Sequence, residues 1–192
     1  MAVSQYALCN LNDVRNYLKI PLNKADDQMD NQLEVLIDQM TAVFESYCER
    51  KFASRSYTEY HDGNAEKYLF PKHYPIISVT SIHDDSDWNW GADKLVDSTT
   101  YRIQDERVIV LKSSLWSKDE QNVKITYVAG YATIPAELKL ACIEEVARKY
   151  KNRNEIDVLA RTAEDGSITK YAKDLLPSTK AILIRYMRVG VV

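Results

Sequence analysis

The sequence predicts an α+β fold, mainly helical, in which an antiparallel β section is inserted between helices. Apolar residues recur every three or four positions from Leu33 to Tyr47, as on one face of a helix. From about residue 54 to residue 128 the pattern changes to short alternating or β-branched runs, which are typical of strands. Helical spacing returns after Pro135. The length suits one domain, whose expected parts are residues 1–53, 54–130 and 134–192.

The composition is that of an ordinary globular protein. Of its 192 residues 45% are hydrophobic and 28% are charged, and the net charge is −3. A nucleic-acid-binding protein would carry an excess of basic residues gathered on one face, so this balance does not favour DNA binding. No apolar run approaches the roughly 20 residues that would cross a bilayer. The first residues lack the charged and apolar regions of a signal peptide, so we expect none.

Two helices are predicted in the first part of the chain. Asn10 can cap the first helix, with Asp13 three residues later, and the next proline blocks its continuation. The second, longer helix is expected from about Asp26 to Phe52, with aspartates in its first turn, where the helix dipole favours negative charge. At about 1.5 Å per residue, residues 27–51 would measure about 37 Å. The predicted buried stripe of this helix is Leu33, Leu36, Ile37, Met40, Val43, Phe44 and Tyr47.

Five strands are predicted in the β section, from runs rich in β-branched and aromatic residues. They are residues 57–60, 76–82, 101–103, 108–111 and 123–128. Stretches that favour turns separate them. These turns are predicted at residues 61–64, 71–75, 84–93 and 118–122.

Two further helices are predicted in the last part. Pro135 opens the first of them at a position where its missing N–H costs nothing. Its apolar residues, Leu140 among them, cover more than one face, which is typical of a helix buried between two neighbours. Residues 155–170 are polar and are expected to form a loop around residues 164–167. The last helix is expected near Pro177, and its apolar residues are Ile182, Leu183, Tyr186 and Met187.

Cysteine and histidine offer little for catalysis. Three widely separated cysteines, an odd number, favour reduced and mostly buried thiols over disulfides, and they are Cys9, Cys48 and Cys142. The histidines His61, His73 and His83 lack the helical spacing of a zinc site, and the chain has no CxxC motif. A small hydrolase would have only His61, His83 and Asp62 as plausible catalytic residues.

The predicted loop at residues 84–93 allows two interpretations. Asp85, Asp87 and Asn89 match the first three ligand positions of a calcium loop, but Trp90 stands where that loop needs glycine, and Val96 where it needs glutamate. A polar hairpin loop fits better. Its two tryptophans then either fold back onto the sheet or serve as interface anchors. These candidate anchors are Trp88 and Trp90.

Several motifs follow one another along the chain in a consistent order. They are LNDVRNYL at Leu11–Leu18, the helical segment 27–52, PIISVTSI at Pro75–Ile82, YVAGY and IPAELK at 127–131 and 134–139, KYKNR at Lys149–Arg153, and the closing segment Leu175–Arg188. In this order and spacing they resemble the head–tail connector (adaptor) proteins of tailed double-stranded DNA phages. The residues 84–93 and 155–170 carry no family pattern.

The resemblance implies a structural virion protein with no catalytic residues and no cofactor. Such connectors assemble in the host cytoplasm into a ring of about twelve copies on the portal vertex. The ring extends the DNA channel without specific DNA binding and docks the next neck or tail protein. The resemblance also places the C-terminal region against the portal protein. The interface candidates there are Leu183, Tyr186, Met187, Val189, Val191 and Val192. The alternatives are a tail-completion or other assembly factor and, less favoured, the small hydrolase.

Overall fold

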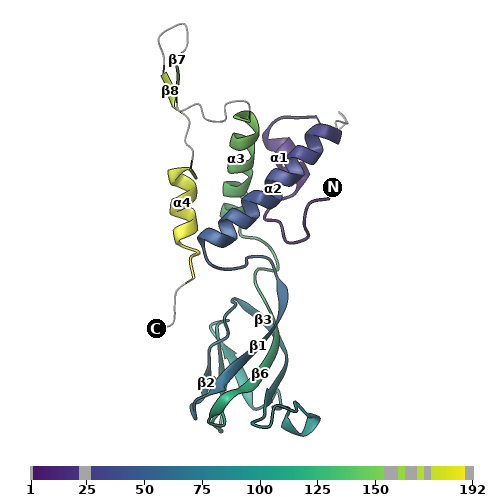
Figure 1. The fold of residues 1–192 in the computed structure, drawn as a ribbon, viewed down its shortest axis with the longest axis vertical. Helices are drawn as coiled ribbons and strands as arrows, with labels where there is room; N and C mark the ends of the chain where they lie inside the picture. The colour runs from purple at the N-terminus through teal and green to yellow at the C-terminus, as the bar shows by residue number, and fades with distance from the viewer. Residues whose placement is uncertain (1, 22–26, 154–159, 163–167, 171–173, 189–192) are drawn as a thin grey trace. The chain divides into compact units, whose positions relative to one another are not determined.

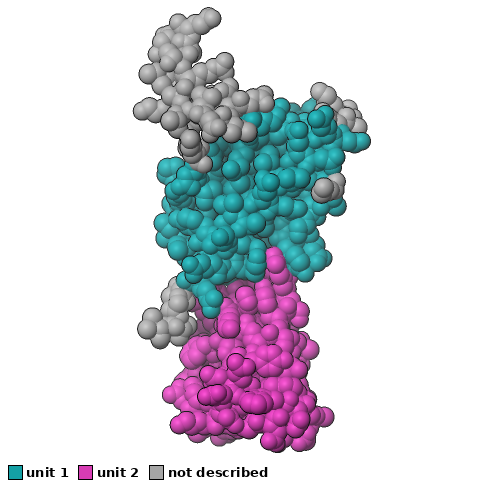
Figure 2. All heavy atoms as spheres, viewed as in Figure 1, with its two compact units in different colours: residues 1–52, 134–192 teal, residues 53–133 magenta. Residues whose placement is uncertain are grey.

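The computed structural model describes residues 2–21, 27–153, 160–162, 168–170 and 174–188. Among these residues it has four α-helices and antiparallel sheets, which confirms the predicted α+β class (Figure 1). The chain forms two compact units, coloured separately in Figure 2. Unit 1 comprises residues 1–52 and 134–192, and unit 2 comprises residues 53–133.

Unit 1 is helical, and α3 is its central helix (Figure 1). The four helices are α1 (Leu11–Tyr17), α2 (Asp27–Tyr47), α3 (Ala136–Lys151) and α4 (Pro177–Ile184). α3 contacts each of the other three, and α4 lies on the side of α3 away from α1. No helix in the described ranges is both long enough and apolar enough to span a membrane.

A side-chain cap begins the first helix, and a backbone turn ends the second. The predicted cap of α1 is confirmed, since Asn10 and Asp13 form a reciprocal capping box. α2 stops at Tyr47, short of the predicted end at Phe52. Glu49 there has a left-handed φ of 53°, and the N–H of residue 50 donates to the carbonyl of residue 45 at 3.1 Å. Glycine usually marks such an end, so the uninterrupted apolar pattern predicted too long a helix.

Most of the predicted stripe of α2 is buried, but Val43 is exposed. It lies about 100° around the helix from the buried Phe44, which turns it away from α3. Leu140 is exposed as well, so α3 is apolar beyond the faces that its neighbours cover within unit 1. The buried core of unit 1 includes Val14, Leu33, Ile37, Met40, Phe44, Leu138, Ala141, Cys142, Val146 and Leu183.

Unit 2 consists of two three-stranded antiparallel sheets that share one core. The first sheet has the order β1-β6-β3, with strands Arg55–Gly63, Asp119–Ala129 and Ile76–Asp84. The second has the order β2-β5-β4, with strands Tyr68–Leu69, Val108–Leu111 and Tyr101–Gln104. A short 3₁₀ helix, η1, spans Ala92–Lys94. The core residues are Leu69, Ile76, Ile82, Ile109, Leu111, Trp116, Val123, Ile125, Tyr127 and Ala129.

The five predicted strands are all present, but two predicted turns belong to strands. β1 continues through residues 61–63, and β6 begins at Asp119. A bulge between His61 and Gly63 lets these two ends pair, which no alternation of apolar residues signals. A Cβ on Gly63 would lie 1.7 Å from the carbonyl oxygen of Ser117, so this position requires glycine. β2 is too short to leave a periodic pattern.

The last part of the chain also differs from the prediction in two places. Strands β7 (Ala160–Thr162) and β8 (Ile168–Lys170) pair antiparallel where only a loop is predicted. The predicted loop centre, residues 164–167, lies outside the described residues. α4 begins at Pro177 as predicted but ends at Ile184. Beyond it, the backbone N–H groups of Tyr186 and Met187 donate to the carbonyls three residues earlier.

Candidate functional site

The structure separates the residues that a hydrolase would use. His61 and His83 lie on β1 and β3, which pair with opposite edges of β6. Their register partners are the consecutive residues 123 and 124, so the two histidines point to opposite faces of the sheet. The Asp62 carboxylate accepts a hydrogen bond from the backbone N–H of Gln121 at 2.7 Å. The three side chains therefore do not converge on one reacting atom.

Glu59 is the centre of a buried polar cluster in unit 2. Its carboxylate accepts hydrogen bonds from the Tyr127 hydroxyl at 2.7 Å and from the backbone N–H of Lys72 at 3.0 Å. It also bonds to His61 Nε2 at 2.8 Å, while His73 Nε2 lies 3.8 Å away. The cluster thus joins β1, β6 and the segment that precedes β3.

The hydrogen bonds keep Glu59 ionised. Burial alone would raise the pKa of Glu59, but bonds from His61, the Lys72 amide and Tyr127 lower it to about 2. Burial, together with the bond to Glu59, raises the pKa of Tyr127. Neither Glu59 nor Tyr127 is suited to exchange a proton near neutral pH, so the cluster fits a stabilising role better than that of an acid–base pair.

The three cysteines are free and buried, as predicted. The Sγ atoms of Cys9 and Cys142 lie 3.8 Å apart in the core of unit 1. Burial raises the pKa of the Cys48 thiol to about 11, although the charge of Arg50 opposes this. A nucleophilic cysteine requires a thiolate, so this environment does not favour catalysis by Cys48.

Asp85 organises the loop that the sequence matches to a calcium loop. Its carboxylate accepts the backbone N–H groups of Asp87, Asn89 and Trp90 at 2.8–3.0 Å. Burial works to raise the pKa of Asp85, but these three bonds lower it overall. Both oxygens of the would-be first ligand are thus engaged by the loop itself. This arrangement fits the polar hairpin interpretation.

The two loop tryptophans behave differently. Trp90 folds back onto the sheet, where its ring centroid lies 5.5 Å from that of Tyr60 and 5.6 Å from Lys124 Nζ. Trp88 is 57% exposed, and its indole N–H donates to the carbonyl of Glu120 at 3.3 Å. Tyr60, Gln121 and the two tryptophans line an open hollow of about 290 Å³. An exposed, partly anchored indole beside such a hollow is suited to a protein contact.

The C-terminal candidates divide into buried and exposed residues. Leu183 is fully buried, and its carbonyl accepts the Cys48 thiol at 3.4 Å. The Tyr186 hydroxyl donates to the Glu137 carboxylate. Met187 is exposed and follows the end of α4. The remaining candidates, Val189, Val191 and Val192, lie outside the described residues.

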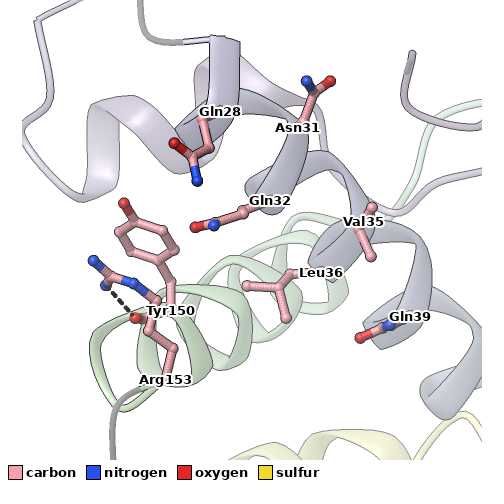
Figure 3. A pocket seen from close by; sticks show the side chains of 8 residues that line it. All are labelled: Gln28, Asn31, Gln32, Val35, Leu36, Gln39, Tyr150 and Arg153. Carbon is pink, nitrogen blue, oxygen red and sulfur yellow. Dashed lines mark hydrogen bonds between the residues drawn. The ribbon is translucent and has the colours of Figure 1, made fainter.

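Unit 1 also carries an open groove of about 540 Å³ between α2 and the end of α3 (Figure 3). The guanidinium of Arg153 lies 4.1 Å from the Tyr150 ring, and its Nη1 donates to the Tyr150 carbonyl at 2.7 Å. This pair forms the α3 side of the groove. The α2 side is lined by Gln28, Asn31, Gln32, Val35, Leu36 and Gln39.

Sequence patterns predict neither the Glu59 cluster nor the groove. One signal for the cluster exists, since Tyr57, Glu59 and His61 alternate on one side of β1. A charged residue on a half-buried strand face needs partners, but those partners, such as Tyr127, come from distant segments that no local pattern connects. The groove depends on the packing of two helices far apart in the sequence.

The fold of this chain is similar to that of chains in structures of gene transfer agent (GTA) particles. The chain matches a structure of the neck of an empty GTA particle computed with C6 symmetry, with 18% identity and a TM-score of 0.65, over 95% of this chain and 90% of that one. It matches the neck of a native GTA particle computed with C12 symmetry, with 19% identity and a TM-score of 0.60, over 100% and 94%. It also matches the virion of a native GTA particle, with 19% identity and a TM-score of 0.63, over 100% and 95%. No curated protein matches the chain.

A family model gives the more specific result. The model described as head completion protein matches residues 7–189, which is nearly the whole chain. This agrees with the phage neck proteins that the sequence motifs resemble and confirms that expectation at the level of the family. The chain belongs to the head completion protein family.

Proposed function

We propose that this chain is a structural protein of the neck of a phage-like particle, where identical copies form a ring at the joint between head and tail. The observation that carries the proposal is the family match over residues 7–189. The neck structures of similar fold were computed with C6 and C12 symmetry, which supports a ring of identical subunits. The ring sits on the portal vertex and extends the channel through which DNA passes.

The charge balance suits a channel that lets DNA slide. A lumen rich in lysine and arginine would hold DNA through its phosphates, whereas this chain carries a net charge of −3. DNA then passes through the lumen without specific binding. The mainly helical adaptor body is unit 1, and unit 2 is the inserted β section.

Each unit has exposed apolar side chains that contact another protein of the neck. In unit 1 the exposed Met187, with Tyr186 and the chain that follows, contacts the portal protein. In unit 2 the exposed Trp88, backed by Trp90, contacts the next neck or tail protein. Large exposed apolar side chains of this kind are typical anchors of protein interfaces.

The proposed role requires no catalysis. Two observations support this view. The candidate catalytic residues His61, His83 and Asp62 do not converge on one point in unit 2, and the neighbours of Glu59 keep its carboxylate ionised. The protein then acts by shape and contact alone.

Electron microscopy of lysates made with a phage that lacks this gene tests the proposal. We expect heads that have packaged DNA, or have leaked it, beside separate and complete tails, because the joint cannot form. Normally joined particles would contradict the proposal. Complete heads beside incomplete tails would favour the tail-completion alternative, and adding back the purified chain should restore joining only in the first case.

A further inference from the structure

The solvent-facing side of α2 has an unusual composition. Beyond Asp27, the first residue of this fully described helix, its exposed residues are all uncharged. They are Gln28, Asn31, Gln32, Val35, Gln39, Ala42, Val43 and Ser46, and they are called the α2 face. A helix side that stays in water normally carries charged residues. The α2 face therefore has the composition of a surface that another protein covers.

Three of the five acidic residues of α2 are bound to neighbouring groups, whereas Asp27 is exposed at its first turn and Glu34 is half-buried. Asp30 forms an ion pair with the buried Arg15 at 3.2 Å, and the buried Glu45 pairs with Lys51 at 2.7 Å. Asp38 accepts the backbone N–H of Ser4 at 3.0 Å. These pairs leave an uncharged strip along residues 28–46, about 27 Å long at about 1.5 Å per residue. Five residues of this strip line the groove of Figure 3, and the Arg153 guanidinium, packed over the Tyr150 ring, stands on its other side.

A second uncharged face lies on α4. The exposed residues of this helix are Pro177, Ser178, Ala181 and Ile184, and they are called the α4 face. Ile184 is 59% exposed, which is costly in water for so large an aliphatic side chain. α3 differs, because Lys149 and Lys151 are among its exposed residues.

Both ends of α4 are bonded to α3. The buried Glu145 accepts the backbone N–H of Leu176, at the start of α4, at 2.7 Å. At the other end of α4, Arg185 pairs with Glu137. α4 lies on the side of α3 away from α1, so its outer face is free of the other helices of unit 1 (Figure 1).

We infer that the α2 face of one copy packs against the α4 face of the next copy in the ring, an inference that rests on the proposed function. A ring generated by rotation uses two different surfaces on each copy, one for each neighbour. The two uncharged faces can meet without burying an unpaired charge. Each copy carries a net charge of −3. Acidic surfaces on two copies would repel each other, whereas the uncharged α2 and α4 faces do not. The small residues Ser178 and Ala181 let a helix approach closely.

Cysteine crosslinking in purified particles tests this contact. Gln39→Cys on the α2 face and Ala181→Cys on the α4 face are introduced singly and together, and Val35→Cys with Ser178→Cys forms a second pair. The native cysteines are buried, so a short flexible bismaleimide reacts with the introduced thiols. Each double variant should give a ladder of dimers, trimers and larger species on a denaturing gel. The single variants serve as matched controls and should remain monomeric.

The possible outcomes separate the inference from the proposed function. A ladder in either double variant, absent from its single variants, supports the α2–α4 contact. Dimers in a single variant would instead mean that like faces meet, and an absence of crosslinks from both pairs in particles that contain the chain would mean that other surfaces form the ring. Either result overturns the inference alone. Absence of the wild-type chain from purified particles would contradict the proposed function itself.

Discussion

Glu59 illustrates how a single residue can organise one unit without any catalytic role. It is buried beside the core of unit 2 yet remains charged, because three donors surround it. Removing a partner from such a carboxylate leaves a buried polar group unsatisfied, which costs more than the bond contributes net. The stability of unit 2 therefore depends on this cluster, which joins β1 to Tyr127 of β6.

Replacing Glu59 with glutamine should destabilise unit 2. The substitution keeps the shape but removes the charge and places an amide N–H₂ among donors, so we expect a loss of about 1–3 kcal/mol in the free energy of unfolding. Urea unfolding followed by tryptophan fluorescence measures this, because the tryptophans Trp88, Trp90 and Trp116 all belong to unit 2. The exposed Glu106→Gln is the matched control and should change little. Equal stability of the two variants would contradict the role given to Glu59.

The same cluster predicts a pH dependence. The pKa of Glu59 is about 2 in the folded chain, below its ordinary 4.5. A lowered pKa stabilises the fold above the unfolded value, and this contribution is lost as the pH falls from about 4.5 toward about 2. The stability difference between wild type and Glu59→Gln should thus shrink as the pH falls from about 4.5 toward about 2. A difference that stays constant through this range would show that the Glu59 charge is not stabilising.

At the scale of elements, the ends of the first two helices carry backbone strain. Lys19 and Glu49, each two residues beyond the last residue of α1 or α2, adopt left-handed φ values of 57° and 53°. In both places this residue and the next donate their backbone N–H groups to carbonyls in the last turn of the helix. Glycine is the usual residue at such a helix end. A side chain in this conformation costs energy that the bonds and the surrounding packing offset.

Glu49→Gly should stabilise unit 1. Glycine adopts the left-handed conformation without strain, and after its greater freedom in the unfolded chain is subtracted we expect a gain of about 0.5–1 kcal/mol. Thermal unfolding followed by far-ultraviolet circular dichroism measures the change. Glu49→Ala removes the same carboxylate but keeps the strain, so it should give no gain. A gain with alanine as large as with glycine would mean that the side chain, not the backbone, is responsible.

The elements show where sequence reasoning succeeds and where it fails. The capping box at Asn10, the proline that opens α4 and the five strand runs are local signals, and the structure contains them all. The end of α2 and the pairing at Gly63 depend on unusual backbone conformation and on a distant partner, so the local pattern misplaces them. The short strands β2, β7 and β8 are too brief for any periodicity to signal.

The candidate contact surfaces divide in the same way. Loop tryptophans among aspartate and asparagine residues are visible in the sequence, although only the structure distinguishes the exposed Trp88 from Trp90, which folds onto the sheet. Leu183 has the apolar character of an interface residue, but α4 buries it against the rest of unit 1. The α2 face becomes apparent only once the exposed side of the helix is known, because neutral amides and valines at mixed spacings form no motif.

For the whole molecule, the two units divide the proposed work. In the function proposed above, unit 1 is a helical body whose two uncharged faces meet its neighbours in the ring and whose exposed Met187 meets the portal protein. In the same proposal, unit 2 is a β core whose exposed Trp88 meets the next neck or tail protein. Such a part needs stability and complementary surfaces rather than a reactive group, which agrees with membership of the head completion protein family.

Cryo-electron microscopy of the neck in purified particles tests the central claim most directly. We expect the density at the joint between head and tail to form a closed ring. The helical unit 1 and the β unit 2 should each fit, as separate bodies, into every subunit of that ring. A joint whose density is fully accounted for by other proteins, or particles in which mass spectrometry detects no copy of this chain, would contradict the account.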